Sequence, residues 1–149
     1  MYNSTEIAEI LLKNKKINVN LQDNGGWSPF SHACLKDSYE CVRLMIQDPR
    51  VDVNMANNWG WSPLMWACFR GYTKIIQLLI SYGRNTDIYK KSTKDFIDIF
   101  DGYIKSGSTA LDVAKKWHGD VVQLLEQCQN NPKETQKLWR NQLNLKGKK

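Results

Sequence analysis

Four cysteines and two histidines are the side chains of this sequence best suited to nucleophilic catalysis or metal binding. They are Cys34, Cys41, Cys68, Cys128, His32 and His118. A reactive thiol needs a base within hydrogen-bonding reach. His32 is only two residues before Cys34 on an expected helix, and this is a poor arrangement for a nucleophile and its base. No two cysteines form a Cys-x-x-Cys pair and the histidines are far apart, so the spacing does not predict a zinc site.

Motifs for other kinds of chemistry are also missing from the sequence. The glycine-rich patterns that cradle phosphates, G-x-x-x-x-G-K-[ST] and G-x-G-x-x-G, do not occur, and neither does the nucleophile motif G-x-S-x-G. Asp95, Asp98 and Asp101 are three residues apart, whereas a calcium-binding EF-hand needs acidic or amide groups at alternating positions. We therefore expect no catalytic residues, no metal and no cofactor.

Two of the cysteines lie in a ten-residue segment that occurs twice, as GGWSPFSHAC at residues 25–34 and WGWSPLMWAC at residues 59–68. Ser-Pro is typical of a helix start, because the hydroxyl caps free backbone N–H groups and Pro suits the first turn. A second apolar segment follows each copy, at residues 41–46 and 75–80. The two copies begin 34 residues apart. Self-similarity at a period of this length predicts a stacked-repeat architecture. Equivalent positions in a repeat also favour buried thiols in a reducing compartment over a disulfide framework.

The repeated segment resembles the ankyrin repeat, whose pattern is roughly D-x-x-G-x-T-P-L-H-x-A-A-x-x-G-H-x-x-V-V-x-L-L-L-x-x-G-A-D-V-N. The residues in register with it are Asn20, Asp23, Gly26, Ser28, Pro29, Ala33, Gly60, Ser62, Pro63, Leu64, Ala67, Gly71 and Gly83. Where the family has His after T-P-L, this chain has Ser31, Met65 and Asp112, so the hydrogen bonds of that His to the turn are not expected. The resemblance covers about residues 4–128. It implies an all-α repeat solenoid of stacked helix-turn-helix repeats with connecting hairpin loops.

The resemblance divides the chain into an ankyrin-repeat domain over residues 1–130 and a C-terminal segment over residues 131–149. The domain is expected to hold a half repeat at residues 4–23, and repeats at about residues 24–57, 58–88 and 107–128. Gly83 is expected to end the second helix of its repeat with a left-handed cap. The third copy has lost one residue around His118, so its inter-helix turn should be distorted. Residues 132–143 are predicted to form a short capping helix, with Trp139 and Leu143 on one face.

An insertion separates the second and third repeats at residues 89–106, where the family places a hairpin. Its apolar residues include Phe96, Phe100 and Tyr103, and aspartates lie between them. One interpretation is that these residues fold back on the repeats, as a helical turn. The other is that Phe96, Phe100 and Tyr103 form an acidic, aromatic contact element for a partner.

Ankyrin repeats usually bind proteins through the hairpin tips and the inner face of each first helix, so the resemblance implies where a partner would bind. Carried over by position, the candidate contact residues are Trp27, His32, Lys36, Trp59, Trp61, Trp66, Phe69 and Arg70. Trp27 and Trp61 precede Ser-Pro in both copies, so they could instead brace the hairpin against the helix. Trp59 stands where copy one has Gly25, and this makes it the better functional candidate.

The net charge of +6 is concentrated at the C-terminus, because residues 131–149 contain six basic residues and a single acidic one. The rest of the chain is nearly neutral, which weakens a case for nucleic-acid binding based on overall charge. No apolar run is long enough to span a bilayer and the N-terminus lacks a secretory signal.

We therefore predict a non-catalytic protein-protein interaction module, such as an adaptor, scaffold or inhibitor. It is expected to be monomeric, cytoplasmic or nuclear, and to bind another protein. The alternative is a nucleic-acid or anionic-membrane binder that uses the basic tail.

Overall fold

The computed structural model describes residues 4–82, 85–98 and 102–145. Short helices dominate these residues, together with one two-stranded antiparallel sheet. The elements are α1 (Ser4–Lys13), α2 (Pro29–Leu35), α3 (Tyr39–Met45), α4 (Pro63–Arg70), α5 (Thr73–Ser81), β1 (Phe96–Asp98), β2 (Gly102–Ile104), α6 (Ala110–Trp117), α7 (Gly119–Asn130) and α8 (Pro132–Gln142).

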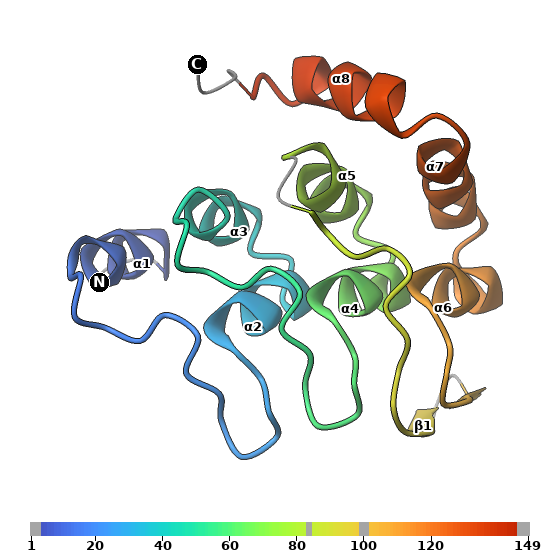
Figure 1. The fold of residues 1–149 in the computed structure, drawn as a ribbon, viewed down its shortest axis with the longest axis horizontal. Coiled ribbons are helices and arrows are strands. Elements are labelled where there is room, and N and C mark those ends of the chain that lie inside the picture. Colours follow the sequence, from blue (N-terminus) through green and yellow to red (C-terminus); the bar gives the residue numbers. More distant parts are fainter. Residues whose placement is uncertain (1–3, 83–84, 99–101, 146–149) are drawn as a thin grey trace.

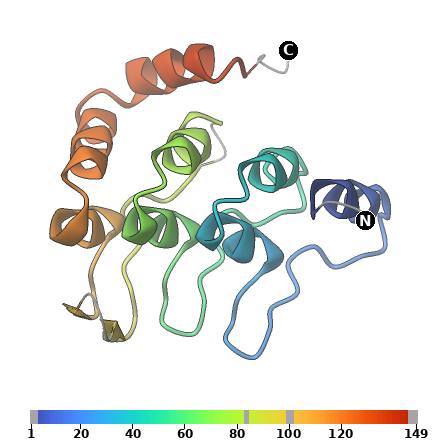
Figure 2. The same ribbon diagram turned by 180° about the vertical axis from the view of Figure 1, so that it is seen from behind.

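The helices are arranged in two rows, and the loops between repeats project to one side as hairpins (Figures 1 and 2). The inner row is α2, α4 and α6, in which each helix contacts the next. In the outer row α1 contacts α3 and α3 contacts α5, while α2–α3, α4–α5 and α6–α7 each form a helix pair. This arrangement confirms the expected all-α repeat solenoid, in which each pair buries the apolar face of its neighbour.

The inner helices begin as the Ser-Pro pattern predicts. The Ser28 hydroxyl accepts a hydrogen bond from the Ser31 N–H at 3.2 Å, and the Ser62 hydroxyl accepts one from the Met65 N–H at 3.3 Å. Thr109 starts α6 with a reciprocal capping box to Asp112. Each cap satisfies N–H groups that the helix itself cannot satisfy.

The turns inside the helix pairs differ between copies. Gly71 ends α4 with φ +71°, and the equivalent residue of copy one is Asp37, which adopts φ +54°. Copy three has only His118 between α6 and α7, and its Nε2 lies 3.0 Å from the Phe69 carbonyl oxygen. The shortened turn therefore attaches copy three to copy two through its own side chain. The cap predicted at Gly83 lies outside the described residues.

The core is centred on the second repeat, because neighbours cover it on both sides. Every residue of α4 except Arg70 is buried, and the apolar residues of α5 are buried as well. Cys34 and Cys68 occupy equivalent buried positions, and burial raises the pKa of both thiols. All four cysteines are free and buried, so they pack as small apolar side chains rather than forming disulfides.

Equivalent asparagines join successive repeats. The Asn20 amide donates to the Arg50 carbonyl at 2.7 Å, and the Asn54 amide donates to the Asn85 carbonyl at 2.9 Å. Ser31, which stands where the family has His, donates to the Met55 carbonyl at 3.4 Å. A contact from this position to the next loop is therefore made, although the sequence did not lead us to expect it.

The half repeat is attached to the stack through Arg50. Its guanidinium pairs with the Asp48 carboxylate at 2.6 Å and also donates to the Leu12 carbonyl at 2.9 Å, next to the end of α1. The hydrogen bond from Arg50 lowers the pKa of Asp48 to about 2. Arg50 therefore joins the segment after α3 to the last turn of α1.

The insertion forms a β-hairpin, so the helical turn expected there is wrong. Phe96 pairs with Ile104 and Ile97 pairs with Tyr103 across the two strands. Phe96 and Ile104 face the repeats, whereas Ile97 is 71% exposed and Tyr103 is 47% exposed. This two-residue alternation is what a strand with one buried face requires.

The C-terminal helix α8 begins at Pro132 and ends one residue earlier than expected. Asn131 precedes it but makes no side-chain capping bond. The helix folds back against α5 and α7 instead of covering the open end of the stack (Figure 1), and it buries Trp139. That end needs little cover, because the outward residues of α6 and α7, such as Lys115, Asp120 and Gln123, are polar and exposed.

Candidate functional site

The hairpin tips form a continuous wall along one side of the inner helices. In copy one the Asp23 carboxylate accepts hydrogen bonds from the Gly25 and Trp27 N–H groups, both at 2.9 Å. In copy two the Asn57 amide oxygen accepts the equivalent bonds from Trp59 and Trp61, at 3.0 and 3.1 Å. These side chains hold each tip in the same shape.

Neighbouring tips are also bonded to one another. The Asn58 N–H donates to the Gly25 carbonyl at 3.0 Å, and the Thr93 N–H donates to the Trp59 carbonyl at 2.9 Å. A Cβ at Gly60 would lie 2.5 Å from the Thr93 nitrogen, so glycine is required where the second tip meets the insertion. The three loops therefore form one surface with fixed spacing, which lowers the entropy cost of binding a partner.

Aromatic side chains from several elements meet between this wall and the inner helices. The Trp66 ring lies 4.5 Å from Trp27 and 4.4 Å from Trp61, centroid to centroid. Phe69 approaches Trp66 edge-on at 5.9 Å and Trp117 at 5.1 Å. The structure thus brings together the predicted residues Trp27, Trp61, Trp66 and Phe69, which we call the aromatic floor.

Most of the aromatic floor is out of reach of solvent. Trp61 is 0% exposed, Trp66 is 4% exposed and Phe69 is 6% exposed. The sequence led us to expect Trp66 and Phe69 at the contact surface, and Trp61 either there or bracing the hairpin against the helix. In this conformation a partner cannot touch these three side chains unless a covering group moves. Trp27 is half-buried. Its packing against Trp66 fits the bracing role that its place before Ser-Pro suggests.

The remaining predicted residues are accessible. His32, Lys36 and Arg70 are exposed on the inner helices, and Trp59 is 37% exposed at the second hairpin tip. His32 stacks on Trp27 with centroids 5.3 Å apart, and its Nε2 lies 2.9 Å from an oxygen of Asp23. The hydrogen bonds from His32 and from the Trp27 N–H hold the pKa of Asp23 below its ordinary value.

Cations lie at the C-terminal ends of the three inner helices. Lys36 follows α2, Arg70 ends α4 with its guanidinium 5.4 Å from the Phe69 centroid, and Lys116 lies 5.0 Å from the Trp117 centroid. Lys116 also donates to the Tyr103 carbonyl at 2.5 Å. The sequence did not single out Lys116, because only the folded insertion brings this contact about.

The insertion contributes one covering residue and one exposed residue to this region. Phe96 lies 4.6 Å from Trp61, 5.5 Å from Trp66 and 5.7 Å from Phe69, so it covers the aromatic floor. The Tyr103 hydroxyl donates to Asp95 at 2.8 Å. Hydrogen bonds from Ser106 and Tyr103 lower the pKa of Asp95. Phe100, the third candidate contact residue of the insertion, lies outside the described residues, as does Asp101.

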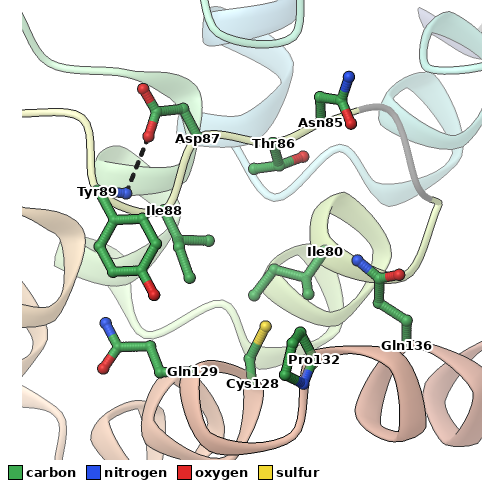
Figure 3. Close-up of a pocket in the computed structure, with 10 residues that line it drawn as sticks. All are labelled: Ile80, Asn85, Thr86, Asp87, Ile88, Tyr89, Cys128, Gln129, Pro132 and Gln136. Atoms are coloured by element: carbon green, nitrogen blue, oxygen red, sulfur yellow. Dashed lines mark hydrogen bonds between the residues drawn. The ribbon is translucent and has the colours of Figure 1, made fainter.

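A separate cavity of about 520 Å³ lies between α5, residues 85–89, α7 and α8 (Figure 3). Ile80, Cys128 and Pro132 contribute to its apolar lining, and Gln129 and Gln136 contribute carboxamides. Among the described residues that line it, no acid-base pair lies next to the buried Cys128 thiol. Within the described ranges, no group of three or more His, Cys, Asp or Glu side chains is placed to hold a metal ion.

Comparison with known protein families identifies one family. A family model for ankyrin repeats, covering three copies, matches residues 1–92 and again residues 51–136. No curated protein matches the chain. Across the part of the chain that the structure describes, every helix is too short or too polar to cross a membrane.

Proposed function

Because the chain belongs to the ankyrin-repeat family, whose repeats generally act as protein-protein interaction modules, we propose that it binds a partner protein without catalysis. The partner contacts the hairpin tips and the exposed side chains of the inner helices, and the chain serves as an adaptor, scaffold or inhibitor. Its four free cysteines suit a reducing compartment, which is the cytoplasm or nucleus.

The exposed indole of Trp59 is the observation that carries this proposal. It stands on a rigid tip, with its main chain bonded to both Asn57 and the insertion. Copy one has Gly25 at the same place, so the repeat itself does not require a tryptophan there. Tryptophan is over-represented among residues that dominate binding energy, because it buries much area with little loss of side-chain freedom.

The chemistry of the surface favours a partner with an apolar segment and acidic groups. Arg70 lies beside Phe69 of the aromatic floor, and Lys36 and Lys116 are exposed near the C-terminal ends of the two neighbouring inner helices. Arginine is also enriched at binding hot spots. Acidic partner groups would be steered toward these cations before they dock, and the association rate should fall as salt is added.

The test is affinity capture from native lysate with a Trp59→Ala, Arg70→Ala double variant. A matched control is Lys137→Ala, Leu138→Ala, which removes one exposed cation and one exposed apolar residue from α8. We expect the first variant to lose the captured protein and the control to retain it. Equal capture by both variants would place the partner elsewhere. Trp66 is unsuitable for this test because it is buried, so its removal would disturb the fold.

A second function is favoured by one feature of α8. Lys133, Lys137 and Arg140 line a shallow hollow together with Leu145, so part of the basic tail forms a defined positive face. This alternative is binding to nucleic acid or to an anionic membrane surface. Such binding weakens steeply with salt, so titration with duplex DNA or phosphatidylserine vesicles at increasing salt separates it from the first proposal.

A further inference from the structure

Copies one and two have the same hairpin geometry, but they differ in the pair of polar side chains beside the hairpin. Asp23 and Asn57 are equivalent, and one oxygen of each accepts two backbone N–H groups of its tip. In copy one the other Asp23 oxygen lies 2.9 Å from His32 Nε2. In copy two the equivalent atoms are the Asn57 amide nitrogen and the Trp66 indole nitrogen, and both of these are hydrogen-bond donors.

Neither donor has an acceptor among the described residues, and the Trp61 indole N–H shares that condition. All three side chains are more than nine-tenths buried. A rotated Asn57 amide would not help, because its oxygen already accepts from the Trp59 and Trp61 N–H groups. Buried donors without an acceptor are rare in folded proteins, and each needs an explanation.

A side chain that packs on the Trp61 and Trp66 rings comes from the insertion rather than from a repeat. Phe96 contacts Trp61, Trp66 and Phe69 from a two-stranded hairpin, and it is itself only half-buried. A two-stranded sheet alone is marginally stable, so β1 and β2 can shift while Thr93 keeps the base of the insertion bonded to the second tip. Moving Phe96 would open a space of about one aromatic side chain beside the Trp61 and Trp66 indoles.

We propose that this hollow is the anchor site of an acidic partner peptide. An aromatic side chain of the partner replaces Phe96, and a neighbouring carboxylate accepts the orphaned N–H groups of Asn57, Trp61 and Trp66. A carboxylate is favoured because the site offers donors only, and because Arg70 adds a cation at the edge of the aromatic floor. This inference rests on the proposed function and names the chemistry of the partner.

The test uses the full chain and follows the six tryptophan indole N–H signals by NMR, assigned with single Trp→Phe variants. The probe is a blocked dipeptide, N-acetyl-Phe-Glu-amide, and its neutral match is N-acetyl-Phe-Gln-amide. We expect the Trp61 and Trp66 signals to move downfield in a saturable way with the Glu probe. The Gln probe should bind roughly tenfold more weakly, as expected for loss of a charged hydrogen bond.

Asn57→Asp supplies the missing acceptor from within the chain. In this variant the Trp66 signal should move downfield before any probe is added, and the Glu probe should lose its advantage. Asn18→Asp is the matched control, because Asn18 makes the same kind of turn on the exposed half repeat. Arg70→Gln lies outside the buried cluster and should weaken binding of the Glu probe alone.

Indole signals that stay unmoved by the Glu probe up to its solubility limit would overturn the proposal. Upfield signals that Asn57→Asp does not change would also overturn it, because the N–H groups would then point at ring faces. These outcomes are separate from failure of the proposed function. If the Trp59 and Arg70 double variant loses its partner but the indole signals do not respond to the probe, the proposed interaction module is retained and only this anchor site is ruled out.

Discussion

Replacing Phe96 with Ala tests how the insertion is attached to the repeats. The Phe96 ring contacts Trp61, Trp66 and Phe69 at centroid distances of 4.6, 5.5 and 5.7 Å. Truncating a fully buried Phe costs about 3–5 kcal/mol. Because Phe96 is only half-buried, we expect the free energy of unfolding to fall by roughly 2 kcal/mol, which corresponds to about 4–8 °C in Tm for a chain of this size.

The assay is urea unfolding followed by tryptophan fluorescence. The emission of folded Phe96→Ala should move to longer wavelength, because Trp61 and Trp66 gain contact with water. Ile97→Ala is the matched control, since Ile97 is the next residue of the hairpin and is 71% exposed. Its unfolding free energy should change by less than about 0.5 kcal/mol. Equal stability losses in the two variants, or unchanged fluorescence in Phe96→Ala, would refute the docking of Phe96 on the aromatic floor.

Three further predictions concern stability and reactivity. Because the folded-state pKa of Asp48 is lowered from 3.8 to about 2, its ion pair stabilises the protein above pH 3.8. That stability is lost as the pH falls toward 2. The unfolding free energy, measured with urea from pH 5 to 2, should therefore depend less on pH in Asp48→Asn than in the unchanged protein. The same slope of unfolding free energy against pH in both would contradict the pairing. Asp37→Gly should raise the free energy of unfolding by about 0.5 kcal/mol, because Asp37 has a φ of +54°. Gly71→Ala should lower it by more than about 1 kcal/mol, since a Cβ there would lie 2.7 Å from the ring of His118. Thermal unfolding measures both, and opposite signs would contradict the turn geometry. The Cys34 and Cys68 thiols should resist iodoacetamide until the protein unfolds, because both are buried and have a raised pKa; mass spectrometry that finds rapid labelling of folded protein would refute their burial.

The repeat architecture could be predicted from sequence because its signals are local. Ser28-Pro29 and Ser62-Pro63 specify helix starts through bonds made within four residues, and the structure contains those bonds. Their spacing then fixes which helices become neighbours. Local chemistry of this kind does not depend on what other segments do.

The features that sequence could not supply depend on contacts between distant segments. Trp66 stands where copy one has the exposed His32, and Phe96, which packs on it, comes from the insertion about 30 residues later. The insertion itself forms strands of only three residues, too short for a two-residue alternation to stand out. Helix α8 shows the same limit, since its extent could be predicted but its position against α5 could not.

Site-specific photo-crosslinking tests the central claim most directly, which is that the hairpin side of the stack binds another polypeptide. A benzophenone amino acid is placed at Trp59 on the second tip and, in a separate sample, at Leu138 on α8; both positions are exposed. We predict that irradiation in native lysate yields a discrete protein adduct from position 59 and none from position 138. Adducts from position 138 alone, or the same adducts from both positions, would contradict the account.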